Sequence, residues 1–227
     1  MTIHGIQGAI NSSGGILYLM AILLLVALTV TIERSWFLSR ILARGSQLLT
    51  QVTGAQKIVG EPSFQHLVDV NPRLPHAKVL ESAIEHNLEH DFSRISDKLE
   101  ECIMHEAPGV DRYLWILDTI VTLAPLMGLL GTILGMFNAF QVLGDPGNSP
   151  TKVTGGVAEA LLATASGLFI AILGLVALNG LNNRVRVIMH QLETLKMMLV
   201  NRLYSHYHEA YDEQRRVMKE MRVRVPA

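Results

Sequence analysis

The sequence predicts an all-α integral membrane protein with three transmembrane helices and long helices that extend into the cytoplasm. Three separate stretches are apolar and long enough to cross roughly 30 Å of hydrocarbon as helices. Other segments repeat apolar residues every three or four positions, which is typical of amphipathic helices. A positive mean hydropathy of +0.31 over 227 residues fits a membrane protein with sizeable aqueous parts.

The first predicted span covers residues 16–34 and has 17 residues without a charge before Glu33. No Lys or Arg precedes it and no small-residue cleavage pattern follows it, so we interpret it as a retained helix and not as a signal peptide. The second span covers residues 115–143, and the third covers residues 155–183.

Pro125 lies within the second span and has no backbone N–H, so it would free the carbonyl of Val121. The hydroxyl of Thr122 could satisfy that carbonyl. We interpret a kink at this position as structural, with a mechanistic role for the kink as the alternative.

The distribution of Lys and Arg predicts the topology. Residues 1–15 contain none, and the loop at residues 144–154 contains only Lys152. The segment at residues 35–114 contains eight, and the tail at residues 184–227 contains nine. By the positive-inside rule the last two segments are cytoplasmic, whereas the N-terminus and the short loop face outward.

Both cytoplasmic segments are predicted to be helical. Between Pro75 and Pro108 an apolar stripe predicts one amphipathic helix, made by Leu80, Ile84, Leu88, Phe92, Ile95, Leu99 and Ile103. A second stripe predicts that the third span continues unbroken into the tail, at Val185, Ile188, Leu192, Leu195, Leu199 and Leu203. Either stripe could pack within one subunit or against neighbouring helices.

Small residues line one side of the second and third spans and predict close contact between helices. In the second span they are Gly128, Gly131, Thr132, Gly135 and Ala139, and in the third Ala160, Thr164, Gly167, Ala171 and Gly174.

Glu159 is the only ionisable residue between Val153 and Asn183. A carboxylate near a helix centre in hydrocarbon costs about 2.5–3.5 kcal/mol on insertion scales, so it indicates a functional site. A protonatable group near the hydroxyls of Ser166 and, more loosely, Thr164 would suit a proton relay. The alternative is a carboxylate that reaches the outer interface or caps the helix.

Two motifs resemble the signatures of the ExbB/TolQ proton-channel family. Residues 124–136 read APLMGLLGTILGM and look like its second-span signature, and residues 155–168 read GGVAEALLATASGL and look like its third-span signature. Matched by motif, Glu159 corresponds to the family's key third-span Glu, and Thr132 and Thr164 correspond to its pore threonines. One departure is Leu173-Gly174, which stands where many members carry a Pro, and it predicts a straighter third helix.

The resemblance, most of all to ExbB, implies a subunit of a proton-motive-force-driven motor in the bacterial inner membrane, with a periplasmic N-terminus and a cytoplasmic C-terminus. It implies a homopentamer around the single spans of an ExbD-like or TolR-like partner. Force would then pass to a TonB-like or TolA-like protein, and protons would be the transported species. A TolQ-like subunit of the Tol-Pal envelope-integrity system and a non-conducting membrane scaffold are the two rival interpretations.

Other features indicate no further chemistry. The net charge of −1 and the lack of a basic patch argue against a nucleic-acid partner. No catalytic motif appears, so we expect neither an enzyme nor a cofactor. The pairs His86/His90 and His206/His208 lack the convergent ligands of a metal site. Cys102 is interpreted as a small helix-face residue, and His66, His76, His105 and His190 as ordinary surface or interface groups.

Overall fold

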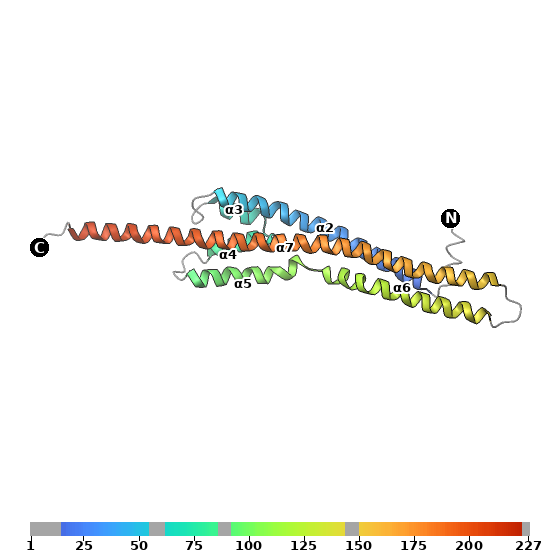
Figure 1. The fold of residues 1–227 in the computed structure, drawn as a ribbon. Helices are drawn as coiled ribbons and strands as arrows, with labels where there is room; N and C mark the ends of the chain where they lie inside the picture. The colour runs from blue at the N-terminus through green and yellow to red at the C-terminus, as the bar shows by residue number, and fades with distance from the viewer. Residues whose placement is uncertain (1–14, 55–61, 86–91, 144–149, 224–227) are drawn as a thin grey trace. The chain divides into compact units, whose positions relative to one another are not determined.

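The computed structural model describes residues 15–54, 62–85, 92–143 and 150–223, and this part of the chain is helical apart from short turns. The helices are α2 (Ile16–Gly54), α3 (Pro62–Val70), α4 (Pro75–Glu85), α5 (Phe92–Val110), α6 (Leu114–Leu143) and α7 (Pro150–Val223), and they can be followed along the chain in Figure 1. The predicted all-α fold is confirmed.

Three helices are long and apolar enough to cross a membrane, in α2, in α6 and in α7. The apolar stretches lie in Ile16–Gly54, Leu114–Gln141 and Val153–Tyr204. These contain the first and third predicted spans and all of the second except residues 142 and 143. The prediction that the third span continues as one helix is also confirmed, because α7 is unbroken over 74 residues.

The chain divides into two compact units. The first, which we call the apolar unit, comprises residues 1–36 and 112–183 and contains α6 with the first parts of α2 and α7. The second, which we call the charged unit, comprises residues 37–111 and 184–227 and contains α3, α4 and α5 with the later parts of α2 and α7.

The apolar unit buries small side chains and exposes large apolar ones. Ala124, Ala160 and Ala163 are at most 3% exposed, whereas Leu126 and Val176 are 61% and 69% exposed. An aqueous protein would bury the large side chains first, because the hydrophobic effect scales with apolar area. The reversed arrangement is expected for a surface whose solvent is lipid.

The charged unit has an aliphatic core, and the stripe of α7 lies at its centre. Ile188, Leu192, Leu195 and Leu199 are fully buried within the chain. The stripe therefore packs within one subunit, which is one of the two alternatives that the sequence left open. Leu38, Ile41, Leu48, Val52, Leu80, Ile95, Leu99 and Ile103 of the other helices complete this core.

The prediction of one helix between Pro75 and Pro108 is wrong. The structure has two helices there, α4 and α5, and they pack against each other, which one straight helix cannot do. Each helix carries part of the predicted stripe, and Leu88 lies outside the described residues. The stripe looked continuous because a chain reversal can keep both apolar faces turned to the same core.

Candidate functional site

The candidate site lies on the facing surfaces of α6 and α7 in the apolar unit. These helices run antiparallel and side by side, so that Gly128 meets Thr164, Gly131 meets Ala163, and Gly135 meets Ala160. The register follows from the small residues, because a larger residue at any of the three glycines would separate the backbones.

The predicted packing glycines are all at this contact. A Cβ atom at Gly131 would lie 2.6 Å from the Cβ of Ala163, and one at Gly135 would lie 2.8 Å from the Cβ of Ala160. At Gly128 it would lie 3.0 Å from the carbonyl oxygen of Ala163. Side chains at these positions would therefore collide with the opposite helix.

Gly167 makes the tightest approach. A Cβ atom there would strike the carbonyl oxygen of Ala124 and would lie 3.2 Å from the Cα of Gly128. Both neighbours are backbone atoms, which cannot rotate away. Only glycine fits this position without moving one helix.

Thr164 bridges the two helices. Its hydroxyl donates to the carbonyl oxygen of Gly128 over 2.9 Å, and the side chain is half-buried. The missing side chain at Gly128 allows this approach. Thr164 therefore has a structural bond at the position where the family resemblance implies a pore hydroxyl.

Thr132 is half-buried on the same side of α6 as the packing glycines. Its hydroxyl donates to the carbonyl oxygen of Leu129, one turn earlier in its own helix, over 2.7 Å. This bond fixes the hydroxyl proton and leaves the two acceptor lone pairs of the oxygen directed away from the helix backbone.

Glu159 is half-buried in the third turn of α7, next to Ala160, which packs on Gly135. It lies five residues before Thr164, or about 7.5 Å along the helix axis. Ser166, predicted to share its face, donates its hydroxyl to the carbonyl of Leu162 over 2.8 Å. Together Glu159, Thr132 and Thr164 occupy about two turns of one helix pair.

Thr122 does not act as the sequence predicted. Its hydroxyl donates to the carbonyl oxygens of Thr119 over 2.9 Å and Asp118 over 3.3 Å, and not to the carbonyl of Val121. A threonine in a helix reaches back three or four residues, so the carbonyl of the preceding residue is out of range. Helix α6 nevertheless continues through Pro125 to Leu143.

The departure at Leu173-Gly174 also has a structural counterpart. Helix α7 passes through Gly174 without interruption, and a Cβ atom there would lie 2.8 Å from the side chain of Val121. The expectation of a straighter helix stays a prediction, since the continuity of α7 does not measure its curvature. Gly174 packs at the level of α6 where Pro125 removes a backbone bond.

Two buried polar residues were missed by the sequence analysis. Arg34 is 3% exposed, pairs with Glu33 at 3.1 Å, and stacks over the ring of Tyr113 at 4.9 Å. The ring also carries Arg112 at 4.5 Å. Tyr113 has a left-handed backbone with φ of 69°, a strained conformation that these stacking contacts help to hold.

His76 is the second such residue. It is 0% exposed, so its interpretation as an ordinary surface or interface group is wrong. Its position directly after Pro75, among apolar residues of α4, was the available signal. The other lone histidines, His66, His105 and His190, are exposed as predicted.

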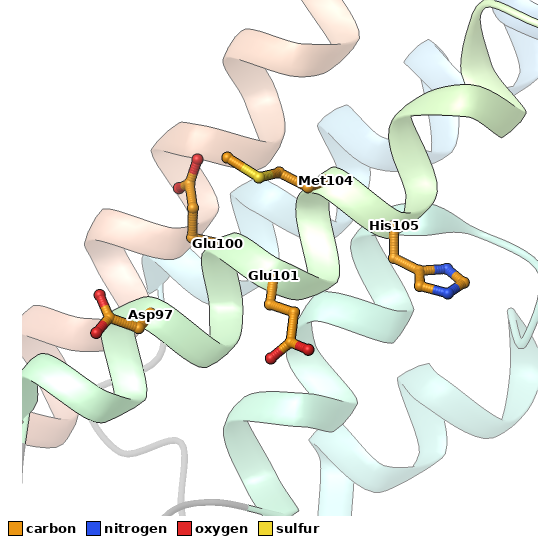
Figure 2. A pocket seen from close by; sticks show the side chains of 5 residues that line it. All are labelled: Asp97, Glu100, Glu101, Met104 and His105. Atoms are coloured by element: carbon orange, nitrogen blue, oxygen red, sulfur yellow. The ribbon is translucent and has the colours of Figure 1, made fainter.

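One shallow groove of about 520 Å³ lies on α5, lined by Asp97, Glu100, Glu101, Met104 and His105. Figure 2 shows the Glu100 and Glu101 carboxylates pointing away from each other and from the His105 ring. Glu100 pairs with Lys196 and Glu101 with Lys98. Within the described ranges no three His, Cys, Asp or Glu side chains could hold a metal ion, and His86 and His90 lie outside those ranges.

Comparison with known proteins decides the family. The model of the MotA/TolQ/ExbB proton channel family matches residues 71–194, more than half of the chain, including both glycine-rich contact segments. The chain belongs to the MotA/TolQ/ExbB proton channel family. The Glu159 region and the α6–α7 contact therefore lie within the part of the chain that defines MotA/TolQ/ExbB membership.

Several curated members of the MotA/TolQ/ExbB family are similar in sequence. An ExbB-like biopolymer transport protein of Synechocystis sp. is 33% identical over 160 residues, which cover 68% of this chain and 74% of that protein. A second from the same organism is 30% identical over 181 residues, covering 71% of this chain and 65% of its own length. The Tol-Pal system protein TolQ of Haemophilus influenzae is 33% identical over 140 residues, covering 60% and 56%. The chain thus spans about half to three quarters of the length of these relatives.

Proposed function

We propose that this proton-channel-family subunit works as an ExbB-like component of an inner-membrane motor driven by the proton-motive force. With an ExbD-like single-span partner it would energise TonB-dependent transport across the outer membrane. The proposal draws on family membership and on the names of the ExbB-like relatives. No catalytic step by the chain itself is required.

The observation that carries the proposal is Glu159, a half-buried carboxylate on an otherwise apolar stretch of α7. In its neutral form it can dwell beside lipid-facing helices, and in its charged form it needs water or a partner. The hydroxyls of Thr132 and Thr164 lie within two helical turns, and each keeps acceptor capacity after donating to a backbone carbonyl. We assign Glu159, Thr132 and Thr164 to the proton pathway.

The apolar unit supports an assembly of several copies. Many of its large apolar side chains are exposed in the single chain, so they are available to contact lipid, a partner helix or other copies of the chain. We propose a homopentamer that encloses the partner's membrane helix against the Glu159 side of α7. From the positive-inside rule we propose that the charged unit lies in the cytoplasm and the N-terminus in the periplasm.

A TolQ-like role in the Tol-Pal system, with TolR-like and TolA-like partners, is the second candidate. It is favoured by the similarity to the Haemophilus influenzae TolQ protein, which matches as strongly in identity as the ExbB-like relatives. Both roles use the same apolar unit and would share Glu159.

Complementation tests the proposal. The chain and its cognate partner are expressed in a bacterium lacking its own ExbB-type and TolQ-type subunits, and growth on chelated iron and detergent resistance are scored. We expect wild type to restore iron-limited growth and Glu159→Gln to lose it, because the amide cannot take up and release a proton. Glu193→Gln, which alters an exposed carboxylate of the same helix, should keep full activity.

The outcomes separate the candidates. Rescue of detergent resistance instead of iron uptake would assign the chain to the Tol-Pal branch. Full rescue by Glu159→Gln would remove that carboxylate from the mechanism. Normal membrane insertion with no rescue of either phenotype would favour the non-conducting scaffold.

A further inference from the structure

His76 lies at a junction of three helices in the charged unit. It is the second residue of α4, and its ring is packed against Gly45 of α2 and lies near Gln191 of α7. A Cβ atom at Gly45 would lie 2.6 Å from Nε2 and 2.9 Å from Nδ1 of the imidazole. The missing side chain at Gly45 therefore forms a cradle for the His76 ring.

The junction favours an uncharged imidazole. Within the described part of the chain, neither ring nitrogen of His76 nor the Oε1 atom of Gln191 has a well-aligned hydrogen bond. Burial lowers the pKa of His76 from 6.5 to about 4, and the nearby Gln191 amide opposes this only in part. The positive end of the α4 dipole at this first turn acts in the same direction as burial.

Ionisable groups on the neighbouring helices are exposed or paired elsewhere, and on α3 these are His66 and Asp69, both exposed. Arg44, which adjoins the cradle on α2, is exposed and carries the same sign of charge. On α7, His190 and Glu193 are exposed to solvent. On α4 itself, Lys78 is engaged with Glu106 of α5 at 2.6 Å. A proton taken up by the imidazole would thus be held in an apolar site without a counter-ion in contact.

We propose that His76 is an acid-operated latch, which holds α4 against α2 and α7 while the imidazole is neutral and releases α4 when the imidazole takes up a proton. The neutral ring fills the Gly45 cradle and contributes apolar contact. The charged ring regains its hydration only by leaving the junction, since burial of an uncompensated charge is costly.

The direction of the pH dependence follows from the two pKa values. The packed state has a pKa of about 4 and the released state the ordinary 6.5, so the packed state binds fewer protons. Its extra stability is fully present above pH 6.5 and is lost as the pH falls from 6.5 toward 4. Relative to pH 8, the release equilibrium rises about fourfold at pH 6 and about 30-fold at pH 5.

Through this latch, proton flow across the membrane would change the packing of α4 in the charged unit. If protons that pass the spans acidify the face where that unit lies, α4 would be released in response. This coupling rests on the proposed function, whereas the latch itself depends only on the junction and can be tested in the isolated protein.

Cys102 reports the state of α4. It is the only cysteine of the chain, it lies half-buried on α5, and Lys78 and Glu81 of α4 are among its charged neighbours. The full chain, purified in detergent, is reacted with 4,4′-dithiodipyridine at pH 8, 6 and 5. Each rate is divided by that of N-acetylcysteine at the same pH, which removes the titration of the thiol. We expect the normalised rate to rise about fourfold at pH 6 and about 30-fold at pH 5.

Three variants decide the assignment. His76→Gln should show a flat profile, and the matched control His190→Gln, an exposed histidine on α7, should keep the wild-type rise. Gln191→Glu places a carboxylate beside the ring, which stabilises the charged imidazole in the packed state and should also flatten the profile. This variant carries the test if His76→Gln does not fold. A flat wild-type profile, or an acid-dependent rise that survives in the folded His76 or Gln191 variant, would overturn the proposal.

Discussion

The contact between Gly167 and the backbone of α6 makes a quantitative prediction for Gly167→Ala. The new Cβ atom would strike the carbonyl oxygen of Ala124 and would lie 3.2 Å from the Cα of Gly128. Ordinary contacts between carbon atoms are about 3.5–4.0 Å, so α7 must move away by at least a few tenths of an ångström. No side-chain rotation relieves the clash, because both neighbours are backbone.

The cost has two parts. Overpacking at a tight contact costs typically about 1–3 kcal/mol. The same displacement stretches the 2.9 Å bond from Thr164 to Gly128, and an interhelical hydrogen bond in a membrane is worth about 0.6 kcal/mol on average. The two parts sum to about 1.6–3.6 kcal/mol, and the better helix propensity of alanine offsets about 1 kcal/mol of this cost. We expect the free energy of unfolding to fall by about 1–3 kcal/mol.

Gly180→Ala is the matched control, since Gly180 is in the same helix and a Cβ atom there would meet nothing within 4 Å. Alanine should be neutral or slightly stabilising at that position, because glycine is the poorer helix former by about 1 kcal/mol. Unfolding of each purified variant is followed by circular dichroism as SDS is added to mixed micelles. Equal free energies for Gly167→Ala and Gly180→Ala would refute the close approach of α6 and α7.

Three further predictions concern single interactions. Thr164→Val should lower the free energy of unfolding by about 0.6–1.7 kcal/mol in the same SDS assay, whereas Thr164→Ser should keep the bond; equal losses in both variants would contradict it. Burial raises the pKa of the Cys102 thiol, so iodoacetamide should alkylate it at pH 7.5 more slowly than it alkylates the unfolded chain, and equal rates would contradict this. Arg202 donates to the last carbonyls of α2, at Val52 and Thr53, so Arg202→Ala should lower the free energy of unfolding by about 1–3 kcal/mol in thermal denaturation; an unchanged midpoint would contradict it.

The α6–α7 contact shows why parts of the site were predictable. Small residues at spacings of three and four indicate a close helix contact, and Gly128, Gly131, Gly135 and Gly167 lie where α6 and α7 approach each other. Hydroxyl partners were less predictable. A threonine hydroxyl can donate to a carbonyl of its own helix, as Thr132 does to Leu129, or to a carbonyl of a neighbouring helix, as Thr164 does to Gly128. Which of the two bonds forms depends on the distance between the two backbones.

The charged unit shows which features apolar periodicity does not predict. The apolar stripe between residues 75 and 108 predicted the buried positions of Leu80, Ile95 and Leu99 correctly but not the reversal between α4 and α5. Periodicity reports which side of a helix is apolar, and it does not report where the chain turns back. His76 was missed for a related reason, since its position after Pro75 among apolar residues is only a weak signal for a buried ring.

The sequence by itself determined the all-α class, the three apolar spans and the unbroken α7, because these depend on local composition and period. It also made Glu159 a candidate site residue, since a lone ionisable residue in an apolar stretch stands out without any structure. The tertiary structure alone decided the bond from Thr164 to Gly128, the burial of Arg34 and the cradle of His76 on Gly45. Each of these depends on residues far apart in the chain meeting within a few ångströms, which no local pattern specifies.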